Sequence, residues 1–425
     1  MTLFLSSGSF IQFAFFVFFT YLYLRGQGFL LGDPPVLLFL AILSFNMRPF
    51  LDEYFGLSSF GITNGFFKSG FFNQDILIDA ALYIKLSIFI FLVGLFGNPY
   101  NPNKINFSVS RKNYNLYKSC LLLPTIICCV LLIFICFMNG GYQYFNSGGV
   151  EVRVLRTFIP FLTICLTINL TMYQKKSITI ALIITGLGIS VFVGARFLGM
   201  SPLICYFIYL SLLDRKSFSR KLPAIGLCII FFTVFVNFFR ARYSVSETVD
   251  LSFVLLFFLE EISFTSNLVP MAMEYVANND FSYGVNYLGA IASVIPKAAF
   301  WMRVEEGTFS FSSALGLFYD STAIKDGLGL NGSLLGESYF SFGFLGLGVI
   351  LLLSSFCKYI YSSISSNHFL VFFIISSSPY LITSFIFEST IVFRNVFYYS
   401  LLPILVYIVF KMAAKNWKKR GGGVK

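Results

Sequence analysis

Charged residues are scarce in this sequence. Asp, Glu, Lys and Arg make up 12% of the 425 residues, whereas hydrophobic residues make up 57% and the mean hydropathy is +0.80. A soluble domain of this length carries about twice that share of charged residues. The scarcity of charge therefore excludes an ordinary soluble globular protein and indicates a chain that lies in a membrane.

Histidine is almost absent, and the cysteines are not paired in the sequence. The single histidine is His368, and the eight cysteines lie inside or at the ends of apolar runs without a CxxC spacing. Such cysteines behave as small hydrophobic residues and do not indicate a disulfide framework or a metal site. We therefore expect no zinc, no haem and no other cofactor.

The basic residues outnumber the acidic ones by 30 to 19, which gives a net charge of +11. Outside the apolar runs they do not form a basic patch interleaved with aromatic residues, so we expect no nucleic-acid partner. In a membrane protein the excess is explained by positive cytoplasmic loops and by anionic lipid head groups.

Long apolar runs recur from end to end, and each is close to the length of a membrane-spanning helix. The predicted fold class is therefore an all-α, polytopic integral membrane protein with about 11 transmembrane helices (10–12). The predicted spans are residues 8–24, 30–47, 78–97, 119–138, 158–173, 177–195, 197–213, 222–239, 334–356, 369–387 and 397–413.

One long segment with polar residues divides the chain into three predicted parts. Residues 1–239 form a bundle of about eight helices, residues 240–333 form a large loop, and residues 334–425 form about three helices and a basic tail. The apolar stretches of the loop are too short to cross a bilayer and fit helices that lie in the interface. Loops of this length are usually functional, so we expect a lid over a substrate site.

Lysine and arginine separate between the two sides when the predicted spans alternate. One side holds 13 Lys and 5 Arg, and the positive-inside rule makes it cytoplasmic, whereas the outer side holds 3 Lys and 8 Arg. The outer arginines are Arg48, Arg153, Arg156, Arg196, Arg240, Arg242, Arg303 and Arg394. Arginine binds phosphate or carboxylate in a bidentate manner, so the set predicts an anionic ligand. Each arginine taken alone also fits a lipid anchor or a salt bridge.

Arg196 is the first candidate for this anion site, because it follows Gly194-Ala195 directly between two apolar spans. A charge near the hydrocarbon edge is costly unless it reaches the interface, pairs or serves a ligand. Gly194 and Gly199 on either side allow two backbones to approach closely. The alternative role for Arg196 is an interfacial anchor.

Glu337 marks the point where the long loop re-enters the membrane. The run Asn331-Gly332-Ser333 precedes it and predicts that Glu337 lies in the first turn of a helix, where an anion is favoured. Glu337 is either a capping carboxylate paired with an arginine or a site carboxylate that acts as a base or orients an arginine. Glycines at 343, 346 and 348 suit close helix packing.

Three of these features together resemble the Wzy-type O-antigen polymerases, the oligosaccharide repeat-unit polymerases. They are Gly194-Ala195-Arg196 at the end of a middle span, Arg240-Ala241-Arg242 at the start of the long loop, and Gly332-Ser333-x-x-Gly336-Glu337 at its end. As architecture, the resemblance extends over the whole chain. It implies a metal-independent, GT-C-like lipid-carrier glycosyltransferase in the bacterial inner membrane, with the long loop in the periplasm.

The resemblance also implies the reaction. Donor and acceptor would be undecaprenyl-pyrophosphate-linked glycans on the periplasmic face. The growing chain would be transferred to a new repeat unit with release of undecaprenyl pyrophosphate. The flippase, chain-length regulator and ligase of the same pathway would be partners.

This chemistry suggests roles for the candidate residues. Arg196, with Arg240 and Arg242, is expected to hold the donor pyrophosphate, and Glu337 is the first choice for a base that activates the acceptor hydroxyl. Arg153 and Arg156 are second candidates for holding the pyrophosphate, and Glu261 or Glu260 is the next choice for the base. The substrate-binding candidates are Arg153, Arg156, Glu260, Glu261, Arg303 and Arg394.

Two alternative functions share part of this pattern. An O-antigen ligase has the same kind of architecture and donor, but that family carries a histidine in its long periplasmic loop, and residues 240–333 contain none. A lipid-linked oligosaccharide flippase or other transporter would place its charges within spans around a central cavity and would have short loops. The charges at the outer span ends and the long loop favour the polymerase.

Overall fold

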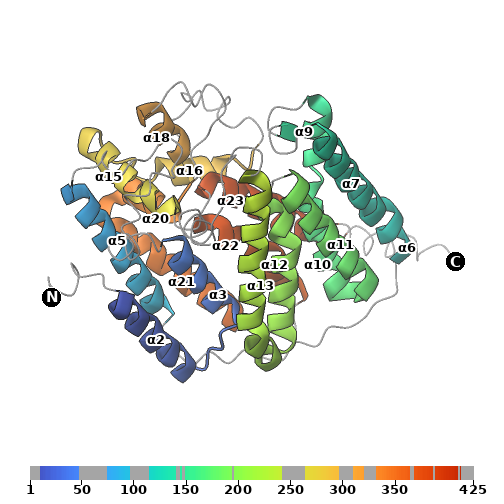
Figure 1. Ribbon diagram of the computed structural model, residues 1–425, viewed down its shortest axis with the longest axis horizontal. Coiled ribbons are helices and arrows are strands. Elements are labelled where there is room, and N and C mark those ends of the chain that lie inside the picture. The colour runs from blue at the N-terminus through green and yellow to red at the C-terminus, as the bar shows by residue number, and fades with distance from the viewer. Residues whose placement is uncertain are drawn as a thin grey trace. The chain divides into compact units, whose positions relative to one another are not determined.

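The computed structural model describes residues 10–46, 74–95, 114–139, 144–145, 149–193, 196–241, 264–295, 310–319, 332–363, 368–385, 388–409 and 412. Within these residues the regular elements are all helical (Figure 1). The chain forms two compact units. Unit 1 comprises residues 1–104, 210–365 and 381–393, and unit 2 comprises residues 105–209, 366–380 and 394–425.

Six helices in the described part are long and apolar enough to cross a membrane. They are Asp75–Gly94, Tyr114–Met138, Val150–Tyr173, Lys176–Val193, Leu334–Ser362 and Ser389–Val409. Three shorter apolar helices, Pro34–Phe45, Leu198–Leu213 and Phe369–Ile382, coincide with three more predicted spans. The two remaining predicted spans, residues 8–24 and 222–239, fall on α2 (Phe10–Gly26) and α13 (Arg215–Ala241). The all-helical, polytopic fold is therefore confirmed. Of the eleven predicted spans, six correspond to described helices that are long and apolar enough to cross a membrane.

Unit 1 is built around contacts between long helices. Helix α5 (Gln74–Gly94) packs along α21 (Leu347–Ser362), and α3 (Pro34–Phe45) packs against both. A Cβ atom on Gly94 would lie only 1.7 Å from Ser354 Oγ, so this close approach depends on glycine. Beyond it, Lys358 Nζ donates to the carbonyl of Leu95 at 2.9 Å and satisfies an end of α5.

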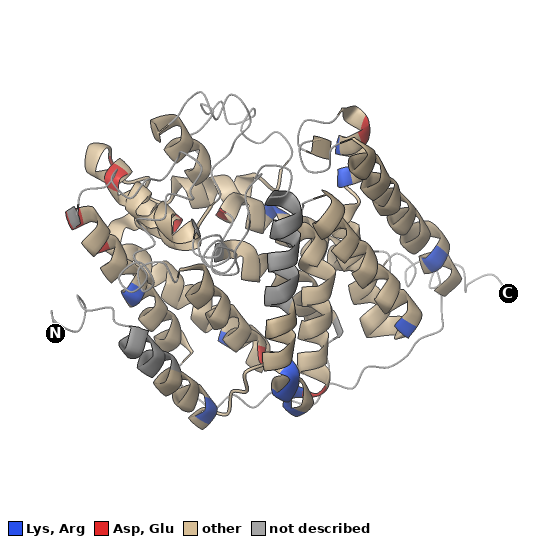
Figure 2. Ribbon diagram, viewed as in Figure 1, with Lys and Arg blue, Asp and Glu red and all other residues tan. Residues whose placement is uncertain are grey.

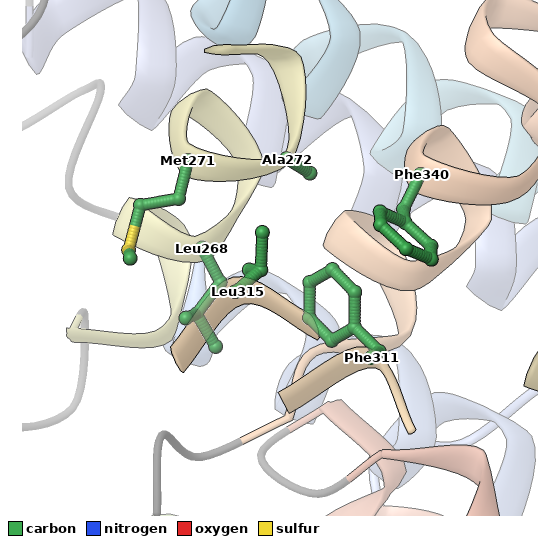
Figure 3. Packing of buried hydrophobic residues seen from close by; sticks show 6 residues of the cluster. All are labelled: Leu268, Met271, Ala272, Phe311, Leu315 and Phe340. Carbon is green, nitrogen blue, oxygen red and sulfur yellow. The ribbon is translucent and has the colours of Figure 1, made fainter. Parts of the chain in front are cut away.

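Three short helices of unit 1 pack on α20 (Leu334–Phe342). They are α15 (Leu268–Asn278), α16 (Val285–Ala292) and α18 (Phe311–Tyr319), and none has the length of a membrane span. Figure 3 shows the apolar core between α15, α18 and α20, formed by Leu268, Met271, Ala272, Phe311, Leu315 and Phe340. A Cβ atom on Gly336 would lie 2.9 Å from the carbonyl oxygen of Leu268, so α15 lies directly on the backbone of α20.

A 3₁₀ turn, Gly343–Gly346, separates α20 from α21. Gly343 has φ = 57°, a left-handed conformation that favours glycine. A Cβ atom on Gly346 would lie 2.3 Å from the carbonyl oxygen of Ser338, whereas one on Gly348 would meet nothing within 4 Å. The packing role expected for Gly348 is therefore wrong, because this residue faces open space.

Unit 2 consists of helices interrupted by wide π-helical turns. Its helices are α6 (Tyr114–Tyr117), α7 (Leu123–Met138), α9 (Val150–Arg156), α10 (Ile159–Ile168), α11 (Lys176–Gly188), and most of α12 (Arg196–Leu213) and α22 (His368–Ile382). The π-helical turns are Lys118–Leu122, Asn169–Tyr173, Ile189–Val193 and Phe397–Leu401. Each such turn forms i→i+5 hydrogen bonds and widens the helix locally.

Helices α11 and α12 pack tightly on either side of the chain reversal before Arg196. A Cβ atom on Gly199 would lie 2.5 Å from the carbonyl oxygen of Gly186 and 2.4 Å from Ser190 Oγ. The close backbone approach that the sequence predicted at Gly199 is therefore confirmed. Gly194 lies outside the described residues.

Polar contacts in unit 1 join residues that the predicted topology assigns to the same side. The inner pairs are Arg215–Gly28 and Lys358–Leu95, and the outer pairs are Thr265–Phe45 and Asn286–Glu337. Arg215 also forms a bidentate ion pair with Asp33, with nitrogen–oxygen distances of 2.8 and 2.6 Å. Figure 2 shows that charged residues are sparse along the helices and lie mostly near their ends.

Candidate functional site

Glu337 lies in the first turn of α20, as the sequence predicted. Ser333 caps this helix with extended backbone and accepts a hydrogen bond from the amide of Gly336 at 3.4 Å. The Glu337 amide then donates the first helical bond to the carbonyl of Ser333 at 2.8 Å. The Glu337 side chain points into the protein and is 0% exposed.

Three donors hold the Glu337 carboxylate in place. Asn286 Nδ2 donates to Oε1 at 2.8 Å. Ser389 donates twice, from its hydroxyl to Oε1 at 2.5 Å and from its backbone amide to Oε2 at 2.8 Å. Glu337 therefore connects α20 with α16 and with the start of α23 (Ser389–Val396), two segments that lie about 50 residues away on either side in the sequence.

Glu388, the residue before Ser389, is a second buried carboxylate close to Glu337. Its Oε2 accepts hydrogen bonds from the hydroxyls of Ser310 and Ser312, at 2.8 and 2.9 Å, and from the Ser312 amide at 3.1 Å. These donors belong to the start of α18. Glu388 therefore caps α18, while Glu337 caps α23.

Two neighbouring buried carboxylates need stabilisation, and helix N-termini with serine hydroxyls supply it here. Within the described residues, no lysine or arginine forms an ion pair with Glu337 or Glu388. The arginine partner considered for Glu337 is thus not found in this part of the chain. Because both carboxylate oxygens already accept hydrogen bonds, Glu337 would have to exchange these bonds to act as a base on a substrate.

Asn286 joins this network through all of its polar side-chain atoms. Its Oδ1 lies 2.7 Å from the hydroxyls of both Ser282 and Ser341, and its Nδ2 donates to Glu337. The Tyr287 hydroxyl is also buried, without a hydrogen-bond partner among the described residues. Burial and the Glu337 charge raise the pKa of Tyr287, so this hydroxyl stays protonated beside the network.

Sequence reasoning missed Asn286, Glu388 and Ser389. Glu388-Ser389 carried a usable signal, since a carboxylate followed by a serine stands where an apolar run ends. Asn286 carried none, because it is one polar residue in an amphipathic stretch, and only the packing of α16 on α20 brings it to Glu337.

The structure places Arg153 and Arg156 on the exposed surface of α9 and Arg394 in the exposed last turn of α23. No carboxylate among the described residues forms an ion pair with these arginines. The guanidinium of Arg156 lies over the ring of Phe145, 4.7 Å from its centroid, which restrains the side chain. These arginines therefore present positive charge at the protein surface.

The remaining predicted site residues are described in part or not at all. Arg196 is the first residue of α12 and Arg240 lies in the last turn of α13, but neither side chain is described. The predicted residues outside the described part are Arg48, Arg242, Glu260, Glu261 and Arg303. A shared anion site formed by Arg196, Arg240 and Arg242 therefore stays a prediction.

Among the described residues, no group of three or more His, Cys, Asp or Glu side chains could hold a metal ion. All eight cysteines are free thiols, and most of them are buried.

Comparison with protein families gives a match that covers both units. The family model for O-antigen polysaccharide polymerase Wzy matches residues 3–419, nearly the whole chain. Comparisons with curated proteins and with solved structures found no match. The chain belongs to the Wzy family, the membrane-embedded, glycosyltransferase-type polymerases that act on lipid-linked oligosaccharide repeat units of O-antigen.

Proposed function

We propose that this polymerase joins undecaprenyl-pyrophosphate-linked repeat units at the periplasmic face of the inner membrane. The family supports polymerisation of lipid-linked units. The excess of arginine over lysine on the predicted outer side, 8 to 3, supports an anionic substrate group at that face. The flippase that supplies the units, the chain-length regulator and the ligase that uses the product are the proposed partners.

In the proposed reaction a hydroxyl at the non-reducing end of the acceptor unit attacks the anomeric carbon of the donor chain. The new glycosidic bond forms while the bond from that carbon to the pyrophosphate oxygen breaks. Undecaprenyl pyrophosphate leaves with the electron pair, and the acceptor hydroxyl loses its proton. Negative charge develops on the leaving pyrophosphate, so fixed positive groups at that position lower the barrier.

The proposal assigns this charge to arginines, without a metal ion. Arg196, Arg240 and Arg242 are proposed to hold the pyrophosphate, with Arg153 and Arg156 as further members of this anion site. Arg303, Arg394, Glu260 and Glu261 are proposed to bind further substrate groups. Arginine suits this task because it stays protonated and grips phosphate through two parallel bonds.

The observation that supports this assignment best is the state of Arg153 and Arg156. Both side chains are exposed on α9, and neither is paired with a described carboxylate. Positive charge is therefore available at the predicted outer end of this candidate span. A structural arginine in a membrane protein is more often neutralised by an internal partner.

A complementation experiment tests the function. The gene is deleted in its native host, and the surface glycan is displayed on a gel after restoring the wild type, Arg196→Ala or Arg196→Lys. We expect that deletion leaves lipid carrying a single repeat unit and that Arg196→Ala does the same at normal membrane levels. Failure of Arg196→Lys to restore long chains would show that the guanidinium geometry is needed.

Arg220→Ala is the matched control, because Arg220 is an exposed arginine that lies on the predicted cytoplasmic side. It should give long chains of wild-type length. If deletion removes all glycan, including single units, the ligase or flippase function is supported and the polymerase proposal is wrong. If Arg196→Ala still makes long chains, Arg196 is an interfacial anchor.

A further inference from the structure

We infer that Asn286 and Glu337 form a positioning pair, which seats the loop helix α16 on α20 and keeps the Glu337 carboxylate away from the reacting groups. This inference rests on the proposed function for its catalytic consequence. It differs from the expectation that Glu337 is the base, since the pair acts on the substrate only through the segments that it holds.

The hydrogen bonds of the pair fix the orientation of the Asn286 amide. Asn286 is 0% exposed, and the two serine hydroxyls at its Oδ1 can donate to that oxygen. The opposite orientation would bring the amide oxygen against the Glu337 carboxylate, with two acceptors facing each other. Asn286 must therefore present its N–H group to Glu337 when that carboxylate is ionised.

The Asn286–Glu337 bond is the contact between α16 and α20 that involves a charged group. Other contacts also hold this segment on α20. The Ser282 and Tyr283 amides donate to the carbonyls of Phe340 and Ser341, both at 3.1 Å, the Ser341 hydroxyl lies 2.7 Å from Asn286 Oδ1, and the ring of Tyr287 stacks on that of Phe342. The outward face of α16 is aliphatic, with Leu288 64% and Ile291 57% exposed. Asn286 is thus the side chain of α16 that donates a hydrogen bond to the buried carboxylate of Glu337. Because the acceptor is charged, this bond is stronger than one between neutral groups.

The position of α16 matters because it lies in the middle of the predicted loop 240–333. Candidate substrate-binding residues precede it, at Arg240 and Arg242, and follow it, at Arg303. A helix fixed halfway along the loop restricts both flanking segments. Release of α16 should therefore weaken substrate positioning even though Asn286 itself touches no substrate.

The test is an exchange of the two side chains. Full-length protein in lipid nanodiscs is assayed with lipid-linked repeat units for rate and acceptor KM. Variants Asn286→Ala and Glu337→Gln should each reduce kcat/KM by about 10-fold or more, as expected when a hydrogen bond to a charged group is lost. The double variant Asn286→Asp/Glu337→Gln should recover most of this loss, because it restores an amide–carboxylate bond with its direction reversed.

The exchange separates positioning from base catalysis, since the double variant has no carboxylate at residue 337. If it stays as inactive as Glu337→Gln while α16 is seated normally, Glu337 acts on the substrate and the inference is wrong. The single variant Asn286→Asp places two carboxylates together, next to Glu388, Tyr287 and Tyr83, and should lose more activity at pH 8 than at pH 6. Asn279→Ala, at an exposed asparagine of the same loop, is the matched control and should behave as the wild type.

Hydrogen exchange measured by mass spectrometry follows α16 independently of any activity. Asn286→Ala should speed exchange at the amides of Ser282 and Tyr283, and the double variant should return it toward the wild-type rate. Unchanged exchange in Asn286→Ala would overturn the inference. Wild-type protein that makes no polymer would overturn the proposed function instead, and the exchange result would still decide whether Asn286 seats α16.

Discussion

The two compact units use their charged residues in opposite ways. In unit 1 the carboxylates of Glu337 and Glu388 are buried, and each caps the start of another helix. In unit 2 the outer-side arginines whose side chains are described, Arg153, Arg156 and Arg394, are exposed and have no described carboxylate as an ion-pair partner. The comparison teaches that the two buried carboxylates hold helices of unit 1 together, while these outer-side arginines of unit 2 remain available at the surface.

The helices of the two units are interrupted in different ways as well. The described interruptions of unit 1 are 3₁₀ turns, such as Gly343–Gly346, whereas those of unit 2 are π-helical turns, such as Ile189–Val193. A 3₁₀ turn narrows the helix and brings backbones together, which suits the dense contacts around α20. A π-helical turn widens the helix and changes which side chains share a face.

The largest effect on function should come from the exposed charges of unit 2. We expect the double variant Arg153→Ala/Arg156→Ala to lower the polymerisation rate by about 100-fold or more, the scale seen when a group that stabilises transition-state charge is removed. Its thermal unfolding temperature should equal that of the wild type. A polymerisation assay together with thermal unfolding in detergent measures both, and Arg220→Ala is the control.

An equal loss of stability and activity in this double variant would break the comparison. It would show that Arg153 and Arg156 hold unit 2 together in the same way that the carboxylates hold unit 1. Normal polymerisation by this double variant would show that Arg153 and Arg156 do not belong to the proposed anion site.

The largest effect on stability should come from Glu388 in unit 1. Glu388→Ala leaves the hydroxyls and the amide at the start of α18 without their acceptor, at a cost of about 2–4 kcal/mol. Glu388→Gln retains one acceptor oxygen and should cost about 1 kcal/mol. Thermal unfolding of the purified variants should rank them in that order below the wild type, and the reverse ranking would contradict a capping role.

A smaller loss should follow from a methyl group at Gly346. The alanine Cβ atom would overlap the backbone of Ser338, so we expect Gly346→Ala to cost about 1–3 kcal/mol. Gly348→Ala, two residues away in open space, is the matched control and should stay within about 0.5 kcal/mol of the wild type. Equal unfolding temperatures for the two variants would show that the contact at Gly346 can relax.

The smallest effect should come from Tyr319, which is an internal partner of another carboxylate of unit 1, Glu274. The Tyr319 hydroxyl donates to Glu274, and burial together with this contact raises the pKa of Tyr319, so the donor keeps its proton. Tyr319→Phe should cost about 0.5–1.5 kcal/mol in thermal unfolding. Tyr283→Phe, at an exposed tyrosine of the same loop, should cost nothing measurable.

The sequence predicted what local patterns control. All eleven apolar runs fall on helices, because a run of that length cannot be left exposed as irregular chain in a membrane. The position of Glu337 followed from its distance to the capping residue Ser333. The close approach at Gly199 followed from a small residue beside a chain reversal.

What the sequence could not predict depends on contacts between distant segments. Asn286 and Ser389 reach Glu337 from about 50 residues away on either side, and no local spacing encodes that meeting. Gly346 and Gly348 look equivalent as small residues, but only the three-dimensional packing shows which one faces a neighbour. The topological assignment and the role of Arg196 stay predictions.

Helix α16 is only eight residues long, and its two faces meet different surroundings. Its aliphatic side faces outward, and its asparagine touches a buried charge on the other side. On the prediction that α16 lies in the membrane interface, its outward aliphatic face would contact acyl chains, and lipid packing and a buried carboxylate would be separated by the width of one helix. The composition and thickness of the surrounding bilayer therefore become variables in the behaviour of Glu337, and a rate measured in detergent need not equal the rate in a native membrane.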